Sequence, residues 1–281
     1  MSKFDIEYLK LCKKILTEGY LTPNRTGNDA YKLHHQILSF NLQEEFPILT
    51  TKYVAFKSAV LEMLWIYQAQ SNDVNWLNER GVKIWDEWKI GEDGYYFDKY
   101  FGEESKGTIG TAYGYIVKEF KLIDELINKI KTNPNDRRML ISLWQNSFLN
   151  TATLPSCVWS SEWDVTDGYL NCMVHQRSCD VPLGLPFNIT QYAVLVHLIA
   201  HVTNLKAGTL TWTINNAHIY ENQVEGIKEQ MSRIDMAYDA PTLELNENIK
   251  DFYEFDNSKE LKDIKIKDYK YHSKIKMPIS V

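Results

Sequence analysis

A long apolar stretch begins at Asn188 and runs to Val202 without an Asp, Glu, Lys or Arg side chain. A segment of this length and composition predicts a central, buried helix. Such a helix needs a large core around it, and 281 residues are enough to bury one. No repeat, low-complexity tract or Pro/Gly/Ser-rich linker divides the chain. We therefore expect a single domain that spans residues 1–281.

The other patterned segments predict both helices and strands. Helical spacing of apolar residues predicts helices over Phe4–Leu16, Ala55–Gln68, Lys121–Lys131 and Asn222–Ile234. Alternating or β-branched residues predict strands over His35–Leu42, Met139–Trp144, Tyr169–His175, Thr209–Ile214 and Leu261–Ile266. Because these elements do not follow a strict strand–helix–strand rhythm, we expect a single-domain α/β or α+β fold.

The charge and the cysteines narrow the class of protein. The net charge of −6 argues against general binding to nucleic acids or anionic membranes. The four cysteines form no CxxC pair, and the N-terminal residues have no apolar core of a signal sequence. No run of 18 wholly apolar residues is present. We expect a protein of the reducing cytoplasm with free thiols.

Neighbouring motifs carry groups suited to covalent catalysis on an anionic substrate. Cys157 follows Pro155 in a turn and is a candidate nucleophile if nearby cations lower its pKa. The pair Arg177–Ser178 follows a strand and can hold an anion, and Asn188 lies at the entry of the predicted helix. A buried structural cysteine remains the alternative for Cys157. It is also the expectation for the other thiols, Cys12, Cys172 and Cys179.

Other polar side chains each have two open interpretations. Four arginines could together form a phosphate site: Arg25, Arg137, Arg138 and Arg177. Alternatively, the adjacent Arg137 and Arg138 make surface ion pairs. Glu62 either lies on a narrow solvent-exposed face of its apolar helix or is buried, with a raised pKa that suits proton transfer. His218 and Tyr220, expected just after a strand, either bind a ligand or are surface polar groups.

Two further motifs predict no metal or phosphate chemistry. His197 and His201 are four residues apart but lack the Glu of a metalloprotease motif, so we expect them to pack in a core or interface. The glycines of Gly107–Gly114 lack the Lys-Ser/Thr of a P-loop and indicate a turn. We therefore expect no metal site.

The string Gln176–Ile189 closely resembles the corresponding segment of the thymidylate synthases. Further matches keep the family's order over nearly the whole chain: Asn24–Gly27, Phe46–Lys52, Leu61–Trp65, Ile84–Trp88, Gly110–Gly114, Asp136–Arg138, His218–Tyr220 and Met277–Val281. A resemblance of this extent is far more specific than a short motif such as GxGxxG. It implies a large mixed β-sheet covered by helices, and a homodimer whose subunits meet sheet to sheet.

The same resemblance implies a reaction. It is the reductive methylation of deoxyuridine monophosphate (dUMP) to thymidylate (dTMP). The co-substrate 5,10-methylenetetrahydrofolate would serve as one-carbon donor and reductant, and would leave as dihydrofolate. No metal is implied.

Each matching residue then has an implied role. Cys157 would add to C6 of the uracil ring, and the implied catalytic group is completed by Glu62, Tyr113 and Arg177. The implied nucleotide contacts are Arg25, Arg177, Ser178, Asp180, Gly184, Asn188, His218 and Tyr220, with Arg137 and Arg138 reaching in from the second subunit. Among them Asn188 would read the uracil edge. The implied folate contacts are Lys52, Trp85, Trp88, Asp180, Phe187 and Val281.

Some positions depart from the commonest family pattern. Val158 stands where His is usual, Glu162 stands where Gln is common, and Asn215–Asn216 replaces a Gly-Asp pair. The segment between Trp88 and Gly107 is also unlike that of the best-known members. None of these changes removes a group that the reaction needs, so they affect the hydrogen bonds around Cys157 rather than the reaction.

Other functions remain as alternatives. A dUMP or dCMP hydroxymethylase of the same superfamily would let water, in place of hydride, capture the intermediate. A cytosine-specific enzyme would want an acidic group at the position of Asn188. A cysteine hydrolase would pair Cys157 with His218 and would need an oxyanion hole. A non-catalytic binding protein, for example one that binds RNA, is disfavoured by the acidic charge.

Overall fold

The computed structural model describes residues 1–93 and 102–280. Its helices are α1 (Lys3–Glu18), α2 (Phe56–Tyr67), α3 (Val74–Asn78), α5 (Gly102–Ser105), α6 (Gly114–Glu119), α7 (Leu122–Thr132), α8 (Gly184–Val202) and α9 (Val224–Met231). Its strands are β1 (Tyr20–Thr22), β2 (Ala30–Asn41), β3 (Leu140–Ser142), β4 (Val158–Thr166), β5 (Tyr169–Gln176), β6 (Cys179–Asp180), β7 (Lys206–Tyr220), β8 (Thr242–Leu245) and β9 (Ile264–Lys267). The expected mixed α/β single domain is confirmed.

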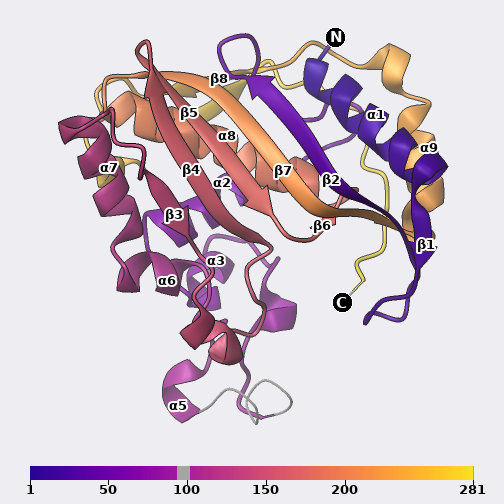
Figure 1. Cartoon of the computed structure of the whole chain (residues 1–281), viewed down its shortest axis with the longest axis horizontal. Coiled ribbons are helices and arrows are strands. Elements are labelled where there is room, and N and C mark those ends of the chain that lie inside the picture. Colours follow the sequence, from indigo (N-terminus) through magenta and orange to yellow (C-terminus); the bar gives the residue numbers. More distant parts are fainter. Residues whose placement is uncertain (94–101, 281) are drawn as a thin grey trace.

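A seven-stranded mixed sheet forms the centre of the fold. Its strands lie in the order β1-β2-β7-β5-β4-β3, and β6 pairs with β7. The β5–β7 and β6–β7 pairs are parallel, and the other pairs are antiparallel. The helices α8 and α2 lie behind this sheet in Figure 1, and the face turned to the viewer carries no helix. The two residues of β6 lie beside Ala217 and His218, near the C-terminal end of β7.

The central helix α8 is a core helix. It has the length and mean hydropathy of a membrane span, but 78% of that window is buried within the fold. It begins at Gly184, four residues before the predicted start at Asn188. Pro186 is tolerated in the first turn of the helix because the N–H it lacks would have no partner there. Asn188 consequently lies inside the second turn of α8.

Strand β7 is much longer than the predicted Thr209–Ile214. It runs from Lys206 to Tyr220, so His218 lies within a strand and not after one. The polar residues Asn215 and Asn216 have low strand propensity, but β2 and β6 pair with this part of β7 on either side. Backbone hydrogen bonds from both neighbours outweigh local propensity.

Strand β4 was not predicted from the sequence. A register shift between Val158 and Ser160 in its pairing with β5 leaves Ser160 and Ser161 both buried. The bulge removes the simple alternation of apolar and polar residues that identifies a strand. Because β4 follows Cys157 directly, it holds one side of the candidate nucleophile.

A buried carboxylate orders the segment that precedes Lys52. Ser2 caps α1 by accepting the backbone N–H of Asp5 at 3.2 Å. The Asp5 carboxylate accepts hydrogen bonds from the backbone N–H and the hydroxyl of both Thr50 and Thr51, at 2.6–3.0 Å. A carboxylate with this many donors is well satisfied despite complete burial. The contact fixes the Thr50–Lys52 turn against the first helix.

Candidate active site

A cavity of about 990 Å³ opens between the β1–β2 loop, the loop before β4 and the ends of β5 and β7. The predicted site residues that line it are Arg25, Trp88, Cys157, Arg177, Ser178, His218 and Tyr220. They come from segments that are far apart in sequence, and the sheet brings them together. A cavity with arginines on its wall and a thiol beside them suits an anionic ligand that reacts with the thiol.

Arg177 holds the loop that carries Cys157. Its Nε donates to the Ser156 carbonyl at 3.0 Å, and its Nη2 donates to the Pro155 carbonyl at 2.6 Å. The same Nη2 lies 3.7 Å from Cys157 Sγ. The backbone N–H of Arg177 also donates to the Cys157 carbonyl at 2.9 Å. The guanidinium therefore both positions the thiol and places a positive charge beside it.

The pKa of Cys157 is raised above its usual value because burial disfavours the thiolate, while the charges of Arg177 and Arg25 oppose the rise. The condition set for a nucleophile, a pKa lowered by nearby cations, is therefore not met in the structure described. The direction expected from the cations is correct, but desolvation is the larger effect. The thiol is held largely protonated at neutral pH, so a proton must leave Sγ when it attacks.

Tyr113 contacts both the Cys157 backbone and the Trp85 ring. Its hydroxyl accepts the backbone N–H of Cys157 at 3.1 Å. It stands just before α6 with a φ of 46°, and Gly114 follows it. A Cβ at Gly114 would lie 2.0 Å from the Ser71 carbonyl oxygen, so only glycine lets the chain pass there. The Tyr113 ring packs edge-on against Trp85 at 5.3 Å between centroids.

Glu62 is buried and does not lie on a solvent-exposed face of its helix. Trp85 Nε1 donates to its Oε1 at 2.5 Å, and Gln191 Nε2 donates to its Oε2. Burial raises the pKa of Glu62 from 4.5 to about 7, and these two donors oppose the rise. The prediction that a buried Glu62 would have a raised pKa is confirmed. A carboxyl that titrates near neutral pH can both take up and release a proton.

This raised pKa predicts a pH dependence of stability. The folded protein holds the Glu62 proton more tightly than the unfolded chain does, so its stability falls as pH rises from 4.5 to about 7. Glu62→Gln removes this loss, and relative to the wild type it should gain roughly 3 kcal/mol between pH 4.5 and pH 8. Urea unfolding of both proteins at the two pH values measures the difference. An equal difference in unfolding free energy between the two proteins at pH 4.5 and pH 8 would show that folding does not raise the pKa of Glu62.

Asp180 lies among groups that join the cavity to the C-terminal segment. Gln223 Nε2 donates to Asp180 Oδ2 and to the Pro278 carbonyl, both at 3.0 Å. Burial raises the pKa of Asp180, and the hydrogen bond from Gln223 opposes this. Asn28 also donates to Ser280 Oγ at 3.2 Å. The last described residues are thus attached on both sides, while Val281 lies outside the described residues.

The structure places the remaining predicted residues away from the cavity wall. Lys52 is buried, and its Nζ donates to the Pro182 carbonyl; burial lowers its pKa to about 8. Phe187 and Gly184 are half-buried in the first turns of α8. Arg138 is 84% exposed and pairs with Asp136, and both it and Arg137 line a separate surface hollow.

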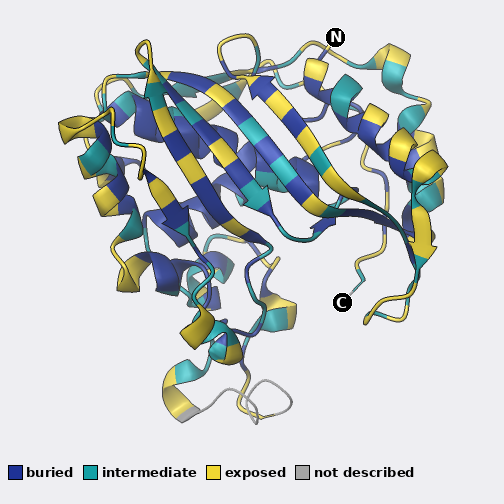
Figure 2. Ribbon diagram, in the orientation of Figure 1, coloured by how far each residue is buried: buried dark blue, intermediate teal, exposed yellow. Residues whose placement is uncertain are grey.

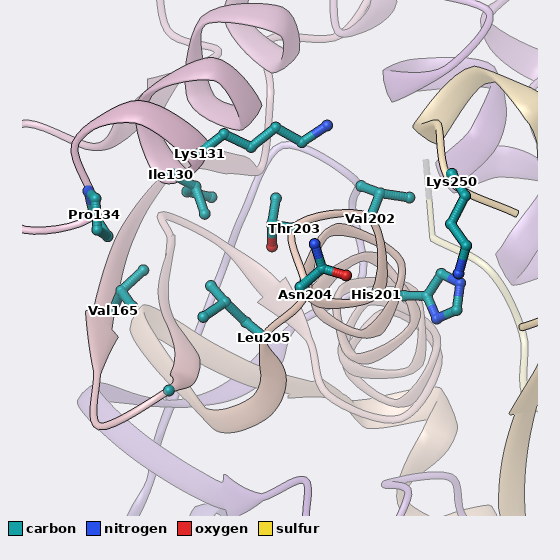
Figure 3. A pocket seen from close by; sticks show the side chains of 11 residues that line it. Ile130, Lys131, Pro134, Val165, His201, Val202, Thr203, Asn204, Leu205 and Lys250 are labelled. Atoms are coloured by element: carbon teal, nitrogen blue, oxygen red, sulfur yellow. The ribbon is translucent and has the colours of Figure 1, made fainter.

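Another hollow, of about 620 Å³, lies at the C-terminal end of α8 (Figure 3). Its walls include Lys131, Thr203, Asn204 and Lys250 but none of the predicted site residues. His201 lines it and bonds the Ile249 carbonyl at 2.9 Å, and the ring of the half-buried His197 lies 6.2 Å from that of Phe46. These contacts fit the expected packing role of both histidines. In residues 1–93 and 102–280, no group of His, Cys, Asp or Glu side chains could hold a metal ion.

The unusual residues make local hydrogen bonds. Glu162 Oε1 lies 3.1 Å from His175 Nε2, and Asn216 Oδ1 lies 3.2 Å from His218 Nδ1. Val158 is buried and pairs with Gln176 across β4 and β5. Within the described part of the chain, the Cys157 thiol contacts Arg177 and not His218. This arrangement does not favour a cysteine hydrolase, which needs an imidazole at the thiol.

Sequence reasoning missed several glutamines that support these groups. Gln176, Gln191 and Gln223 are buried, and each bonds to a predicted site residue. Gln191 could have been found, because it is a polar residue in an apolar helix and follows Asn188 by three positions. The Arg177 guanidinium lies over the Trp144 ring, 5.6 Å from the ring centroid. No sequence pattern pointed to this tryptophan.

Comparisons with known proteins agree along the whole chain. The family model described as thymidylate synthase matches residues 6–281. The chain is 55% identical over 281 residues to the thymidylate synthase of Clostridium beijerinckii and 36% identical over 299 positions to that of Bacillus licheniformis, with 100% of each chain covered. The solved structure of thermostable thymidylate synthase A from Bacillus subtilis matches with a TM-score of 0.86 at 35% identity, covering 99% of both chains. The chain therefore belongs to the thymidylate synthase family.

Proposed function

We propose that Cys157 begins the conversion of dUMP to dTMP, the methyl transfer that this chain catalyses as a member of its family. Addition of Sγ to C6 forms a carbon–sulfur bond, moves the ring electrons to C5 and makes C5 a nucleophile. The bond breaks again when the product leaves. The observation that carries this proposal is the Cys157 thiol beside the Arg177 guanidinium at 3.7 Å, on the wall of one cavity.

Residues around this thiol would recognise the nucleotide. Arg25, Arg177 and Ser178 line the same cavity and would hold the phosphate. His218 and Tyr220, whose rings lie 5.1 Å apart on β7, would bind the 3′-hydroxyl of the deoxyribose. Asn188 would read the uracil edge through its half-buried amide, and Gly184 and Asp180 would complete the nucleotide contacts.

Glu62 would serve as the proton-transfer group. It has a pKa of about 7 and is linked by Trp85 to the Tyr113 ring, whose hydroxyl holds the Cys157 backbone. It can therefore exchange a proton near neutral pH without direct exposure to solvent. Ordered solvent between Glu62 and the base would complete the path.

The co-substrate we propose is 5,10-methylenetetrahydrofolate, which supplies the one-carbon unit and the hydride and leaves as dihydrofolate. Trp88 lines the cavity, Trp85 lies at 5.5 Å from its ring, and Asp180 contacts the C-terminal segment through Gln223. These groups, with Lys52, Phe187 and Val281, would bind the folate. The direct test mixes the protein with dUMP and this folate and follows dihydrofolate absorbance and dTMP together. Formation of 5-hydroxymethyl nucleotide without dihydrofolate would indicate the hydroxymethylase instead, which the 55% identity does not favour.

We also propose that the protein works as a homodimer in the cytoplasm, with residues 1–281 as one catalytic domain. Figure 2 shows that buried and exposed residues alternate along the strands of the sheet, as expected when one face is covered and the other is open. Several exposed side chains there are large and apolar: Ile37 (67%), Leu140 (51%), Met173 (40%) and Trp159 (38%). A surface of this kind is suited to a second copy of the chain. The cysteines are free, as a reducing compartment would keep them.

Arg137 and Arg138 should then complete the partner's phosphate site, because they are exposed and lie outside their own cavity. Arg138→Ala and Cys157→Ala should each be inactive alone. When equal amounts are reassorted, a mixed dimer regains one intact site, and total turnover should reach about a quarter of the wild-type value. Native mass measurement verifies the mixed dimers. Verified mixed dimers without activity would refute the shared site.

A further inference from the structure

The turn formed by Thr50 and Thr51 holds the start of the C-terminal segment. The Thr50 carbonyl accepts the backbone N–H of His272 at 2.8 Å. The Thr51 carbonyl accepts Arg233 Nη1 at 3.0 Å, and the same nitrogen donates to the Ser273 carbonyl at 2.7 Å. The path of the last residues toward the cavity therefore begins at this turn.

The turn also leads directly to a second group that we propose for the folate. The residue after it is Lys52, whose buried Nζ donates to the Pro182 carbonyl. The C-terminal segment continues from Ser273 to Pro278, whose carbonyl accepts the hydrogen bond from Gln223. Lys52 and the C-terminal segment thus share one base, although more than 200 residues separate them in the sequence.

The fully buried Asp5 carboxylate of α1 fixes the direction of the hydrogen bonds in the turn. An ionised carboxylate can only accept, so each hydroxyl gives its single proton to Asp5, from Thr50 at 2.8 Å and from Thr51 at 2.6 Å. The hydroxyl lone pairs then accept the backbone N–H of Tyr238 at 3.0 Å and Gln230 Nε2 at 2.9 Å. Asp5 thereby joins the turn to α9, which lies beside α1 in Figure 1.

An amide in place of this carboxylate would not fit the donors around it. Oδ2 of Asp5 accepts the backbone N–H and the hydroxyl of Thr50, and Oδ1 accepts those of Thr51. An asparagine would place its NH2 group against one backbone N–H, which cannot turn away. Two hydrogen bonds would be lost on that side, and water could not readily replace them because all three residues are buried.

The proposed nucleotide site is built from other segments. Among the described residues, the cavity wall includes none of Asp5, Thr50 and Thr51. Arg25 reaches the cavity from the β1–β2 loop, and Arg177 reaches it from the end of β5. A displaced turn should therefore affect the folate and leave the binding of dUMP unchanged.

We propose that Asp5 is a positioning residue for folate binding. Its carboxylate holds the Thr50–Thr51 turn so that Lys52 and the C-terminal segment lie where the folate binds. The first helix of the chain then sets the affinity for folate without forming part of the cavity wall. This inference rests on the proposed folate roles of Lys52 and Val281.

The test is the separation of folate and nucleotide binding in Asp5→Asn. The KM for 5,10-methylenetetrahydrofolate should rise about tenfold or more, the effect of one or two buried hydrogen bonds, while kcat at saturating folate falls by a smaller factor. The Kd for dUMP, measured by calorimetry, should stay within about twofold of the wild-type value. An equal loss of dUMP binding would show that the variant damages the whole site and would overturn the proposal.

Thr51→Val and Thr51→Ser form a matched pair. Valine has nearly the shape of threonine but lacks the hydroxyl, so it should raise the folate KM in the same direction as Asp5→Asn. Serine keeps the hydroxyl that donates to Asp5 and should stay closer to the wild type. Equal KM values in the valine and serine variants would contradict the role of this hydrogen bond. If Asp5→Asn does not fold, this pair decides.

Glu45→Gln separates positioning from a general loosening of α1. The Glu45 carboxylate accepts the backbone N–H groups of Lys3 at 2.8 Å and Phe4 at 2.7 Å, so it holds the start of the same helix. This variant should keep the folate KM within about twofold of the wild-type value. A rise equal to that in Asp5→Asn, or no rise in Asp5→Asn, overturns the proposal.

Lys52→Met separates this inference from the function on which it rests. An unchanged folate KM both in Lys52→Met and after deletion of Val281 would refute the folate roles of these residues, and the role of Asp5 with them. A raised KM in Lys52→Met with a normal value in Asp5→Asn would refute the role of Asp5 alone. The expected result is a raised folate KM in Lys52→Met, Asp5→Asn and Thr51→Val.

Discussion

Replacing Cys157 with alanine is expected to reduce dTMP formation by roughly 10⁴-fold or more, because no other group can form the bond to C6. The methyl side chain removes the sulfur while the Arg177 bonds to the Ser156 and Pro155 carbonyls remain. The loop should therefore keep its position. Binding of dUMP, measured by calorimetry, should remain within about tenfold of the wild-type value because the phosphate contacts are intact.

Cys179→Ala is the matched control for this variant. Cys179 is a buried thiol on β6, two residues after Arg177, and burial raises its pKa well above its usual value. A buried thiol of this kind is inert, so its removal should leave turnover close to that of the wild type. Near-normal turnover in Cys157→Ala would exclude the covalent mechanism. Loss of activity in both variants to the same degree would indicate a structural role for the thiols.

Deletion of Val281 is expected to slow methyl transfer by about 100-fold or more, while dUMP binding stays near normal. The preceding residues are attached to the site by the bonds from Gln223 to the Pro278 carbonyl and from Asn28 to Ser280. Removing the last residue moves the terminal carboxylate back to Ser280. The folded tail should then cover the bound folate less well and admit water to the reacting carbon.

Partial reactions identify the step that the tail affects. Release of tritium from C5 of dUMP needs only addition and proton loss, so it should persist better than dTMP formation in the deletion variant. Gln223→Leu should reproduce part of the defect, because it removes the donor that joins Pro278 to Asp180. Full dTMP formation without Val281, or equal loss of nucleotide binding and chemistry, would show that the tail does not close the site.

The sequence alone predicted most long elements and the chemical roles of the site. The period of apolar residues located α1, α2, α7, α8 and α9 to within a few residues, because a helix that packs on one face must repeat its apolar positions. The family string predicted the fold and the reaction, which the comparisons confirm. The resemblance also named seven residues of the cavity wall, whose individual roles stay predictions.

Pairing with neighbouring strands determines the extents of β4 and β7, which local sequence patterns did not predict. The bulge in β4 and the polar end of β7 have no regular period, and they become strands because their neighbours supply backbone partners. The buried state of Glu62 depends on Trp85 and Gln191, which lie 23 and 129 residues away in sequence. No local pattern contains that information.

The sequence determined which groups are present: a thiol, several arginines, a carboxylate and an asparagine in an order typical of one family. Only the tertiary structure decided their states. Burial raises the pKa of Cys157 although cations lie beside it, and burial brings the pKa of Glu62 to about 7. The Asn188 amide accepts a hydrogen bond from Gln176 and donates one to Gln191. Desolvation and hydrogen-bond direction depend on all neighbours in space, and these neighbours meet only when the sheet and α8 are assembled.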